Sequence, residues 1–204
     1  MGFGNISPLS ASTVLSNLAN SFGDYVQLNN GPLTVQGAQA FTTGSGTWTL
    51  NSVTIQLQAF ASGTDDLILT LNADDNGGIP DTLLAALDLT PSGTISTSPT
   101  DYTYDPAVTV TLDGDTTYWL VASTTSTIYN WRGTTSNSYT GDPGWSLATE
   151  HYVKVNSNPW TPSGASSSLF VSIDATAAPV PEPSAWALMV GGLFGIALWR
   201  RKRH

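Results

Sequence analysis

The sequence predicts an all-β fold for most of its 204 residues, an antiparallel β-sandwich of the jelly-roll type. Short stretches alternate apolar residues with Thr, Ser, Asn or Gln, and this period of two is typical of strands with one buried face. Gly, Pro, Asn and Asp end the stretches at short intervals, as at 76–78 and 113–115, and these residues favour turns. Many short strands separated by turns are typical of sandwiches and jelly rolls.

The strand pattern is clearest in a long stretch from Trp48 to Ala59, where Thr and Gln occupy the polar positions. Residues 118–122, Tyr-Trp-Leu-Val-Ala, are apolar throughout and predict a strand buried on both faces. Further strands are expected at 67–71, 108–112, 153–155 and 169–173. Together these stretches place the β domain at residues 12–176.

One segment of this domain is ambiguous. Residues 80–89 fit either a helical turn that Asp81 opens or a strand. We favour a turn that leads into a strand, because Pro91 and Gly93 follow the segment within a few residues and end it.

The composition excludes several classes of protein. Fifteen acidic residues stand against six basic ones, a formal net charge of -9, whereas a nucleic-acid binder needs a basic face to neutralise phosphates. The chain has no Cys, which excludes disulfides, thiolate metal sites and a Cys nucleophile. Two His residues leave little for a His-based metal or proton-transfer centre.

The charges divide the chain into two parts. Residues 1–178 hold 14 acids and 2 bases, a formal charge of -12. Four of the six bases are consecutive near the C-terminus, and they are Arg200, Arg201, Lys202 and Arg203. A change of sign at a Pro-rich junction indicates a segment boundary.

The C-terminal part predicts a membrane anchor. A Pro-rich linker at 177–184 precedes an uncharged apolar segment at 185–199, which as a helix is about 22 Å long against a hydrocarbon thickness of about 30 Å. Trp186 and Trp199 lie near its ends, where aromatic rings prefer the membrane interface. The basic residues 200–204 stop the segment and stay cytoplasmic under the positive-inside rule, so the N-terminus is expected outside.

This tail resembles a known sorting signal. The Pro-Glu-Pro box of Pro181, Glu182 and Pro183, the short Gly-containing apolar segment and the terminal basic cluster resemble the PEP-CTERM signal in all three parts and in order. The resemblance implies export across the inner membrane of a Gram-negative bacterium and recognition by an exosortase, a membrane protease-transpeptidase, near the box. It also implies an association with exopolysaccharide and biofilm matrix.

Export normally needs an N-terminal signal peptide. The first 131 residues contain no Lys or Arg, and the start of the chain has no long apolar run. It does not have the pattern of a Sec signal, so we expect either a translation start upstream of Met1 or a fragment.

The β domain resembles a second family. The stretches at 13–18, 71–84 and 115–123 are similar to the choice-of-anchor R domain, with Trp131 and Trp145 in its later half. This resemblance implies an exported β domain at the cell surface. It implies no ligand and no activity.

We expect no catalytic residues and no enzyme activity. His151 alternates with Val153 and Val155 in an expected strand and fits a structural role, without a nucleophile elbow nearby. The adjacent pairs Asp65-Asp66 and Asp74-Asp75 fall in expected turns, where they fit solvated loop charges and turn caps.

Two binding hypotheses remain. Asp74, Asp75, Asn76 and Asp81 fit either a structural Ca²⁺ loop, although not an EF-hand, or a plain turn rich in Asp and Asn. No other cofactor is expected. Trp131, Trp145 and Trp160 flank Gly, Pro or Asn, which favours either surface rings that stack on sugars or rings packed under loops, whereas Trp119 is expected in the core.

The sequence therefore predicts an exported β protein, anchored in the inner membrane by one span as a precursor and later found at the cell surface or outside the cell. The expected partners are an exosortase and exopolysaccharide, with no nucleic acid. The expected role is structural or adhesive within the biofilm matrix. The alternative is a carbohydrate-binding module, stabilised by calcium or not.

Overall fold

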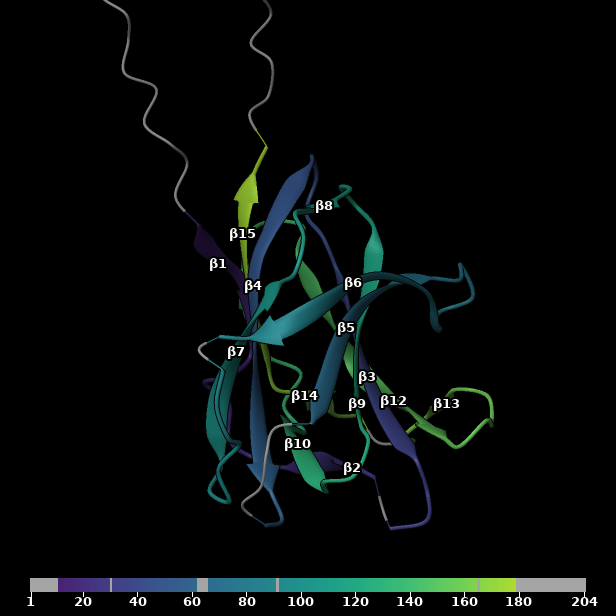
Figure 1. The fold of residues 1–204 in the computed structure, drawn as a ribbon. Coiled ribbons are helices and arrows are strands. Elements are labelled where there is room, and N and C mark those ends of the chain that lie inside the picture. Colours follow the sequence, from purple (N-terminus) through teal and green to yellow (C-terminus); the bar gives the residue numbers. More distant parts are fainter. Residues whose placement is uncertain (1–10, 30, 62–65, 91, 165, 179–204) are drawn as a thin grey trace, which may run out of the picture.

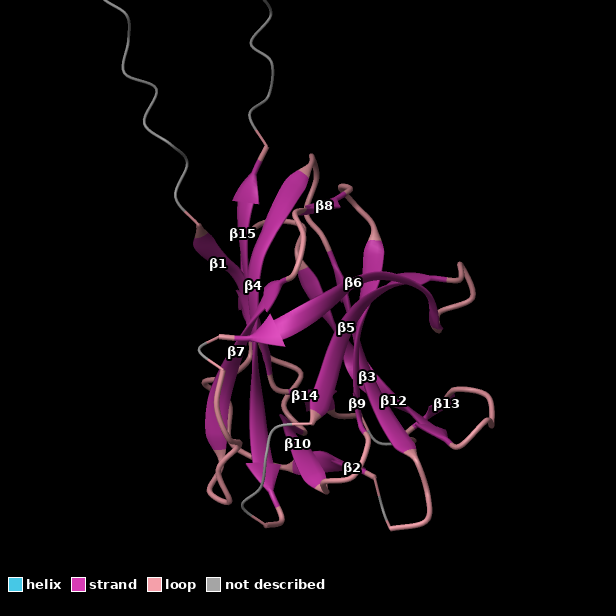
Figure 2. Cartoon of the chain, viewed as in Figure 1, coloured by secondary structure: helices cyan, strands magenta, loops and turns pink. Residues whose placement is uncertain are grey.

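The computed structural model describes residues 11–29, 31–61, 66–90, 92–164 and 166–178. These residues form strands joined by turns and contain no helix (Figure 2). The described residues therefore contain no helix with the length and apolar character needed to cross a membrane. The predicted transmembrane segment at 185–199 lies outside the described residues.

The strands of the described residues begin at Ser12 and end at Ala177. In chain order they are β1 (Ser12–Ser16), β2 (Asp24–Leu28), β3 (Val35–Thr42), β4 (Trp48–Ala59), β5 (Leu67–Asp74), β6 (Pro80–Leu89), β7 (Thr100–Pro106), β8 (Val110–Leu112), β9 (Thr117–Thr124), β10 (Tyr129–Thr134), β11 (Thr140–Gly141), β12 (Ser146–Val155), β13 (Thr161–Pro162), β14 (Ser168–Leu169) and β15 (Val171–Ala177). Every ladder between them is antiparallel. The prediction of an all-β antiparallel fold is confirmed.

The strands belong to one curled sheet in the order β11-β1-β15-β4-β7-β6-β5-β9-β3-β12-β13. The long strand β4 is its branch point, because it pairs with β15, β7, β8 and β10. In Figure 1, β1, β15, β4 and β7 form one side of the molecule, β5, β9, β3 and β12 form the other, and β6 crosses between them. One continuous sheet thus takes the place of the two separate sheets of a simple sandwich.

The inner face of the curled sheet encloses one large apolar core. Residues from both sides meet there, among them Ile55 of β4, Leu71 of β5 and Leu120 of β9, all fully buried. In β9 the side chains of Tyr118 and Leu120 belong to this core, and the residues between them face outward, as the period of two requires. The outward-facing residues of β9 build the site described below.

Two details of the strands differ from the sequence prediction. The ambiguous segment is a strand along its whole length, β6, which pairs with β5 on one side and β7 on the other. The strand expected at 108–112 is shorter, since β8 begins at Val110 and Val108 is exposed. In both cases pairing with the neighbouring strands sets where the strand begins and ends. Local residue patterns do not contain this information.

The two ends of the β domain lie together. Ser12 at the start of β1 pairs with Ala175 near the end of β15. Figure 1 shows both ends at the top left of the molecule, whereas β12 and β13 lie at the lower right. Residue 178, the last described residue, therefore lies at the end of the domain opposite the β12–β13 hairpin.

Candidate functional site

The candidate site lies on the outer face of the sheet where β9, β3 and β12 are neighbours. Here a second apolar cluster, separate from the main core, contains Ala38 and Ala40 of β3 with Trp119 and Val121 of β9. Ala148, Tyr152 and Trp160 pack against it and are half-buried. We call Trp119, Tyr152 and Trp160 the outer aromatic group.

The small residues of β3 make room for the large rings. Ala40 pairs with Trp119, and Ala38 pairs with Tyr152 on the other side. A β-strand places paired residues on the same face with their Cβ atoms about 5 Å apart, so two methyl groups leave space for the neighbouring rings. The rings of Trp119 and Tyr152 meet edge to face with their centroids 5.2 Å apart.

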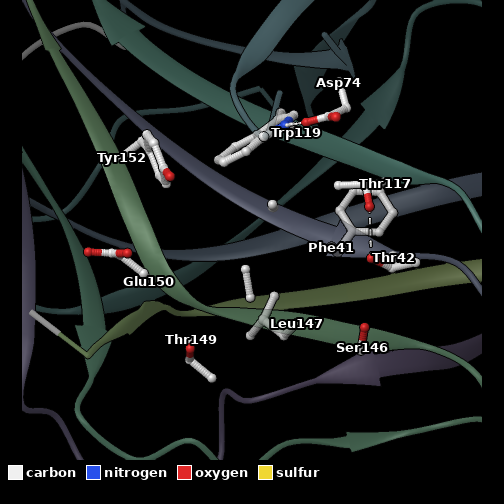
Figure 3. A pocket seen from close by; sticks show the side chains of 13 residues that line it. Phe41, Thr42, Asp74, Thr117, Trp119, Ser146, Leu147, Thr149, Glu150 and Tyr152 are labelled. Carbon is white, nitrogen blue, oxygen red and sulfur yellow. Dashed lines mark hydrogen bonds between the residues drawn. The ribbon is translucent and has the colours of Figure 1, made fainter. Parts of the chain in front are cut away.

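A cavity of about 420 Å³ opens beside these rings. Figure 3 shows Trp119 and Tyr152 on one side of it, with Glu150, Thr149 and Ser146 along β12. Asp74, Thr42 and Thr117 complete the polar part of the wall. Carboxylates accept hydrogen bonds, and hydroxyls both donate and accept them, so the lining offers an apolar platform beside several hydrogen-bonding groups.

Asp74 fixes the indole of Trp119. Its Oδ1 accepts a hydrogen bond of 2.8 Å from Trp119 Nε1 (Figure 3). Its Oδ2 accepts a second bond of 2.9 Å from the backbone N–H of Asn76. Trp119 is only 2% exposed, so this indole forms the floor of the cavity, while the half-buried ring of Tyr152 is the surface that a ligand reaches first.

A bulge in β12 brings Glu150 to the cavity. Between Leu147 and His151 the strand advances four residues while its partner β3 advances two, from Phe41 to Gln39. Extra residues in one strand bend it and redirect side chains, and such bulges are common beside binding sites. Glu150 lies in this bulge, where its Oε1 accepts a 3.2 Å hydrogen bond from the N–H of Gly164.

A second cavity of about 470 Å³ lies on the same outer face. Trp160 and Val121 are among its apolar residues, and Asn72, Asp81 and Lys154 are among its polar residues. The Lys154 ammonium lies 5.7 Å from the centre of the Trp160 ring, within the range of a cation–π contact. The outer aromatic group therefore has a hydrogen-bonding cavity at each end.

For two of the three tryptophans left open between surface and interior, the structure shows the interior. Trp131 is fully buried and its Nε1 donates to the carbonyl of Phe170 at 3.1 Å. Trp145 is 3% exposed and stacks on Phe41 with the planes 7° apart. Neither ring lies on the surface, so neither stacks on an external sugar, and only Trp160 of the predicted three does lie on the outer face.

The missed residues are Trp119, Tyr152 and Glu150. Residues 118–122 are apolar throughout, so the sequence does not show that Trp119 faces away from the main core. The sequence does contain a signal for Tyr152. It alternates with the apolar Val153 and lies two residues before Lys154, which places its ring on the polar, outward face of the strand.

The predicted calcium loop folds as a turn with internal hydrogen bonds. Asp75 Oδ1 accepts hydrogen bonds from the N–H groups of Gly77 at 2.6 Å and Ile79 at 3.2 Å. Asn76 adopts φ 65°, the left-handed region that Asn tolerates in turns. Asp74 is used by Trp119 and Asn76, and Asp81 is exposed on β6. Among the described residues, no three His, Cys, Asp or Glu side chains gather in a way that would hold a metal ion.

His151 is buried and bonded within the fold. It is 2% exposed, and its Nδ1 lies 3.2 Å from the carbonyl oxygen of Ser167. The hydroxyl of Ser167 lies 3.3 Å from His151 Nδ1 and donates to Asp24, so the three side chains are linked in the order His, Ser, Asp. A serine that donates to a carboxylate is not activated by the imidazole, which a catalytic triad requires.

Asp66 is held ionised by the β9–β10 turn. Its Oδ2 accepts hydrogen bonds from the N–H groups of Ser126 and Thr127 and from the hydroxyls of Thr125 and Ser126. Burial opposes ionisation, but the bonds from Thr127, Ser126 and Thr125 outweigh it and hold the pKa of the carboxyl well below its ordinary value. This carboxylate ties the start of β5 to the turn and serves the fold.

The sorting residues Pro181, Glu182 and Pro183 and the basic residues Arg200, Arg201, Lys202 and Arg203 lie outside the described residues. The family described as the PEP-CTERM protein-sorting motif matches residues 179–202. The match covers the Pro-Glu-Pro box, the apolar segment and most of the basic cluster. A comparison with curated proteins finds no match.

The chain is thus an exported β protein with a C-terminal sorting motif. The motif identifies it as an exosortase substrate that is processed at the membrane and displayed on the cell surface.

Proposed function

We propose that this protein is an adhesive or structural component of the extracellular matrix, held in exopolysaccharide through its β domain after processing by the exosortase. The sorting motif at 179–202 carries the proposal, since it directs the chain to the surface. The precursor has its N-terminus outside and a single span at 185–199, with cleavage near Glu182. The resemblance to choice-of-anchor domains fits the same location.

The position of the chain ends supports this role. The last described residues of the domain lie next to β1, whereas the β12–β13 hairpin lies at the other end of the molecule (Figure 1). Two members of the outer aromatic group belong to this hairpin, Tyr152 in β12 and Trp160 directly before β13. A domain attached through its C-terminal linker would present the β12–β13 hairpin away from the attachment point. This is the arrangement that an adhesive module needs.

The second candidate is a carbohydrate-binding module, and the outer aromatic group with its two cavities favours it. Aromatic rings beside a few hydrogen-bonding groups are common in ligand sites. We further propose a binding role without catalysis. Two of the hydrogen-bonded acidic residues serve the fold, since Asp66 holds a turn and Asp74 holds an indole.

The matrix role is tested in the native host by separating cells, matrix and medium and measuring the protein in each. The proposal expects the mature protein in the matrix, and expects its release into the medium when the exopolysaccharide is enzymatically removed. A host that lacks its exosortase should retain the protein in the membrane fraction. Protein that stays on washed cells after the polysaccharide is removed would contradict the proposal.

A further inference from the structure

We propose that the outer aromatic group, with its flanking cavities, binds a pyranose polysaccharide that carries no acidic groups. The inference rests on the proposed matrix role and names the ligand class and the residues that contact it. The ligand would lie across Tyr152 and Trp160, with Trp119 as the floor beneath.

The apolar surface of the site matches one face of a pyranose ring. Such a ring presents axial C–H groups on its faces and hydroxyls around its edge, so it needs a flat apolar partner with hydrogen-bonding groups beside it. Tyr152 and Trp160 are half-buried and pack on one cluster. Their bodies are fixed by neighbouring residues, which lowers the entropy lost on binding.

The polar groups on both sides of the rings are suited to hydroxyls. Asp74, Glu150 and Thr149 line the first cavity, and Asn72 and Asp81 line the second. The bulge in β12 sets the position of Glu150, and Trp119 sets that of Asp74. One cavity is lined by Trp119 and Tyr152 and the other by Trp160, and two ring-lined cavities suit successive sugar units of a chain better than one monosaccharide.

The charge of the site selects against acidic sugars. Asp74 and Glu150 face the first cavity and Asp81 faces the second. Lys154 is the one basic residue lining either cavity, and residues 1–178 carry a formal charge of -12. A polyuronate brings one carboxylate per sugar into this field, and like charges at an interface reduce both association rate and affinity. Neutral and amino-bearing sugars avoid this repulsion.

The test is isothermal titration of the full chain, in a detergent without a sugar headgroup, with cellohexaose, a chitosan hexamer and an alginate hexamer as probes. Tyr152→Ala and Trp160→Ala each remove one ring from the surface. Tyr139→Ala and Phe60→Ala remove exposed rings elsewhere and serve as matched controls. Circular dichroism and thermal unfolding of each variant confirm that it is folded.

We expect binding of cellohexaose or the chitosan hexamer and none of the alginate hexamer. Each site variant should weaken binding about tenfold or more, while both controls retain it. Trp119→Phe removes the bond to Asp74 and part of a buried ring, so it should weaken binding and also lower thermal stability. The surface variants Tyr152→Ala and Trp160→Ala therefore carry the test.

Three results would overturn the inference. Unchanged affinity in both site variants would move the ligand elsewhere on the domain and leave the matrix role standing. Equal or tighter binding of alginate would contradict the ligand class. Absence of binding to all three probes would remove the inference, and the matrix role would then be decided by the fractionation experiment, which does not depend on this site.

Discussion

Two buried amide side chains replace hydrogen bonds that the strands do not supply. Gln39 Nε2 donates to the carbonyls of Ala148 and Ala40, and its Oε1 accepts from the N–H of Leu169. Asn17 bonds the carbonyl of Leu169 and the N–H of Val171. Unpaired buried backbone groups are costly, so these amides stabilise both the β12 bulge and the junction between β14 and β15.

Gln39→Met tests this role at the residue scale. The thioether has a similar volume but leaves the Ala148 carbonyl and the Leu169 N–H without their partner, and we expect a loss of about 3 kcal/mol in the free energy of unfolding. Urea denaturation measures it. Gln56→Met is the control, because Gln56 bonds Asp101 at an exposed position, and a loss there as large as that of Gln39→Met would contradict the account.

Asp66→Asn tests the carboxylate in the β9–β10 turn. The pKa of Asp66 is lowered in the folded protein, so the ionised form stabilises the fold above the unfolded-state value of about 3.9, and this contribution is lost as the pH falls below it. We expect the variant to be about 1 kcal/mol less stable at pH 7. The difference should shrink between pH 5 and pH 3.

Urea denaturation across that pH range makes the measurement. Asp88→Asn, at an exposed position of β6, removes one negative charge without disturbing the turn. A constant difference between wild type and Asp66→Asn at all pH values would show that the carboxylate charge has no part in holding the turn.

At the scale of strands, the sequence predicted those elements whose residues alternate cleanly. The strands β4 and β9 were expected almost to their ends, because their apolar positions repeat at a period of two or fill the strand. The strand β3 was missed, since Gly37 and Gln39 interrupt its pattern, although it lies between β9 and β12 and supports the site. The buried Gln39 in this strand is stabilised by its hydrogen bond to the carbonyl of Ala148 in the β12 bulge. The sequence of β3 alone does not contain this partner.

The candidate site was less predictable than the strands. Trp131 and Trp160 have similar turn-forming neighbours in the sequence, yet Trp131 lies in the core and Trp160 on the outer face. Strand pairing accounts for this difference. Trp131 lies in β10, which pairs with β2, β4 and β14, whereas Trp160 lies directly before β13, at the end of the strand order. Local composition does not determine which distant segments of the chain pair with each other.

Gly133→Ala tests how closely the strands around Trp131 approach. A Cβ at Gly133 would lie 2.6 Å from the carbonyl oxygen of Ser168, a backbone atom of β14. We expect the variant to lose about 2 kcal/mol or more in the free energy of unfolding, because the backbones must separate. Gly141→Ala is the matched control, since its nearest contacts are at 3.2 Å, and an equal loss in both variants would contradict the argument.

At the scale of the whole molecule, a strongly acidic β domain is joined to a basic C-terminal end. The domain has its own core, and its two chain ends lie together away from the β12–β13 hairpin (Figure 1). Removal of the residues beyond the linker would take away Arg200, Arg201, Lys202 and Arg203. Processing near the Pro-Glu-Pro box would therefore make the net charge of the protein more negative.

The measurement that tests this account most directly is the intact mass of the protein isolated from its native host, combined with mapping of its C-terminal peptide. The account predicts a mature C-terminus near residues 179–183, with the apolar and basic segments absent. A chain that ends at His204 in the surface or matrix fraction would contradict processing by an exosortase.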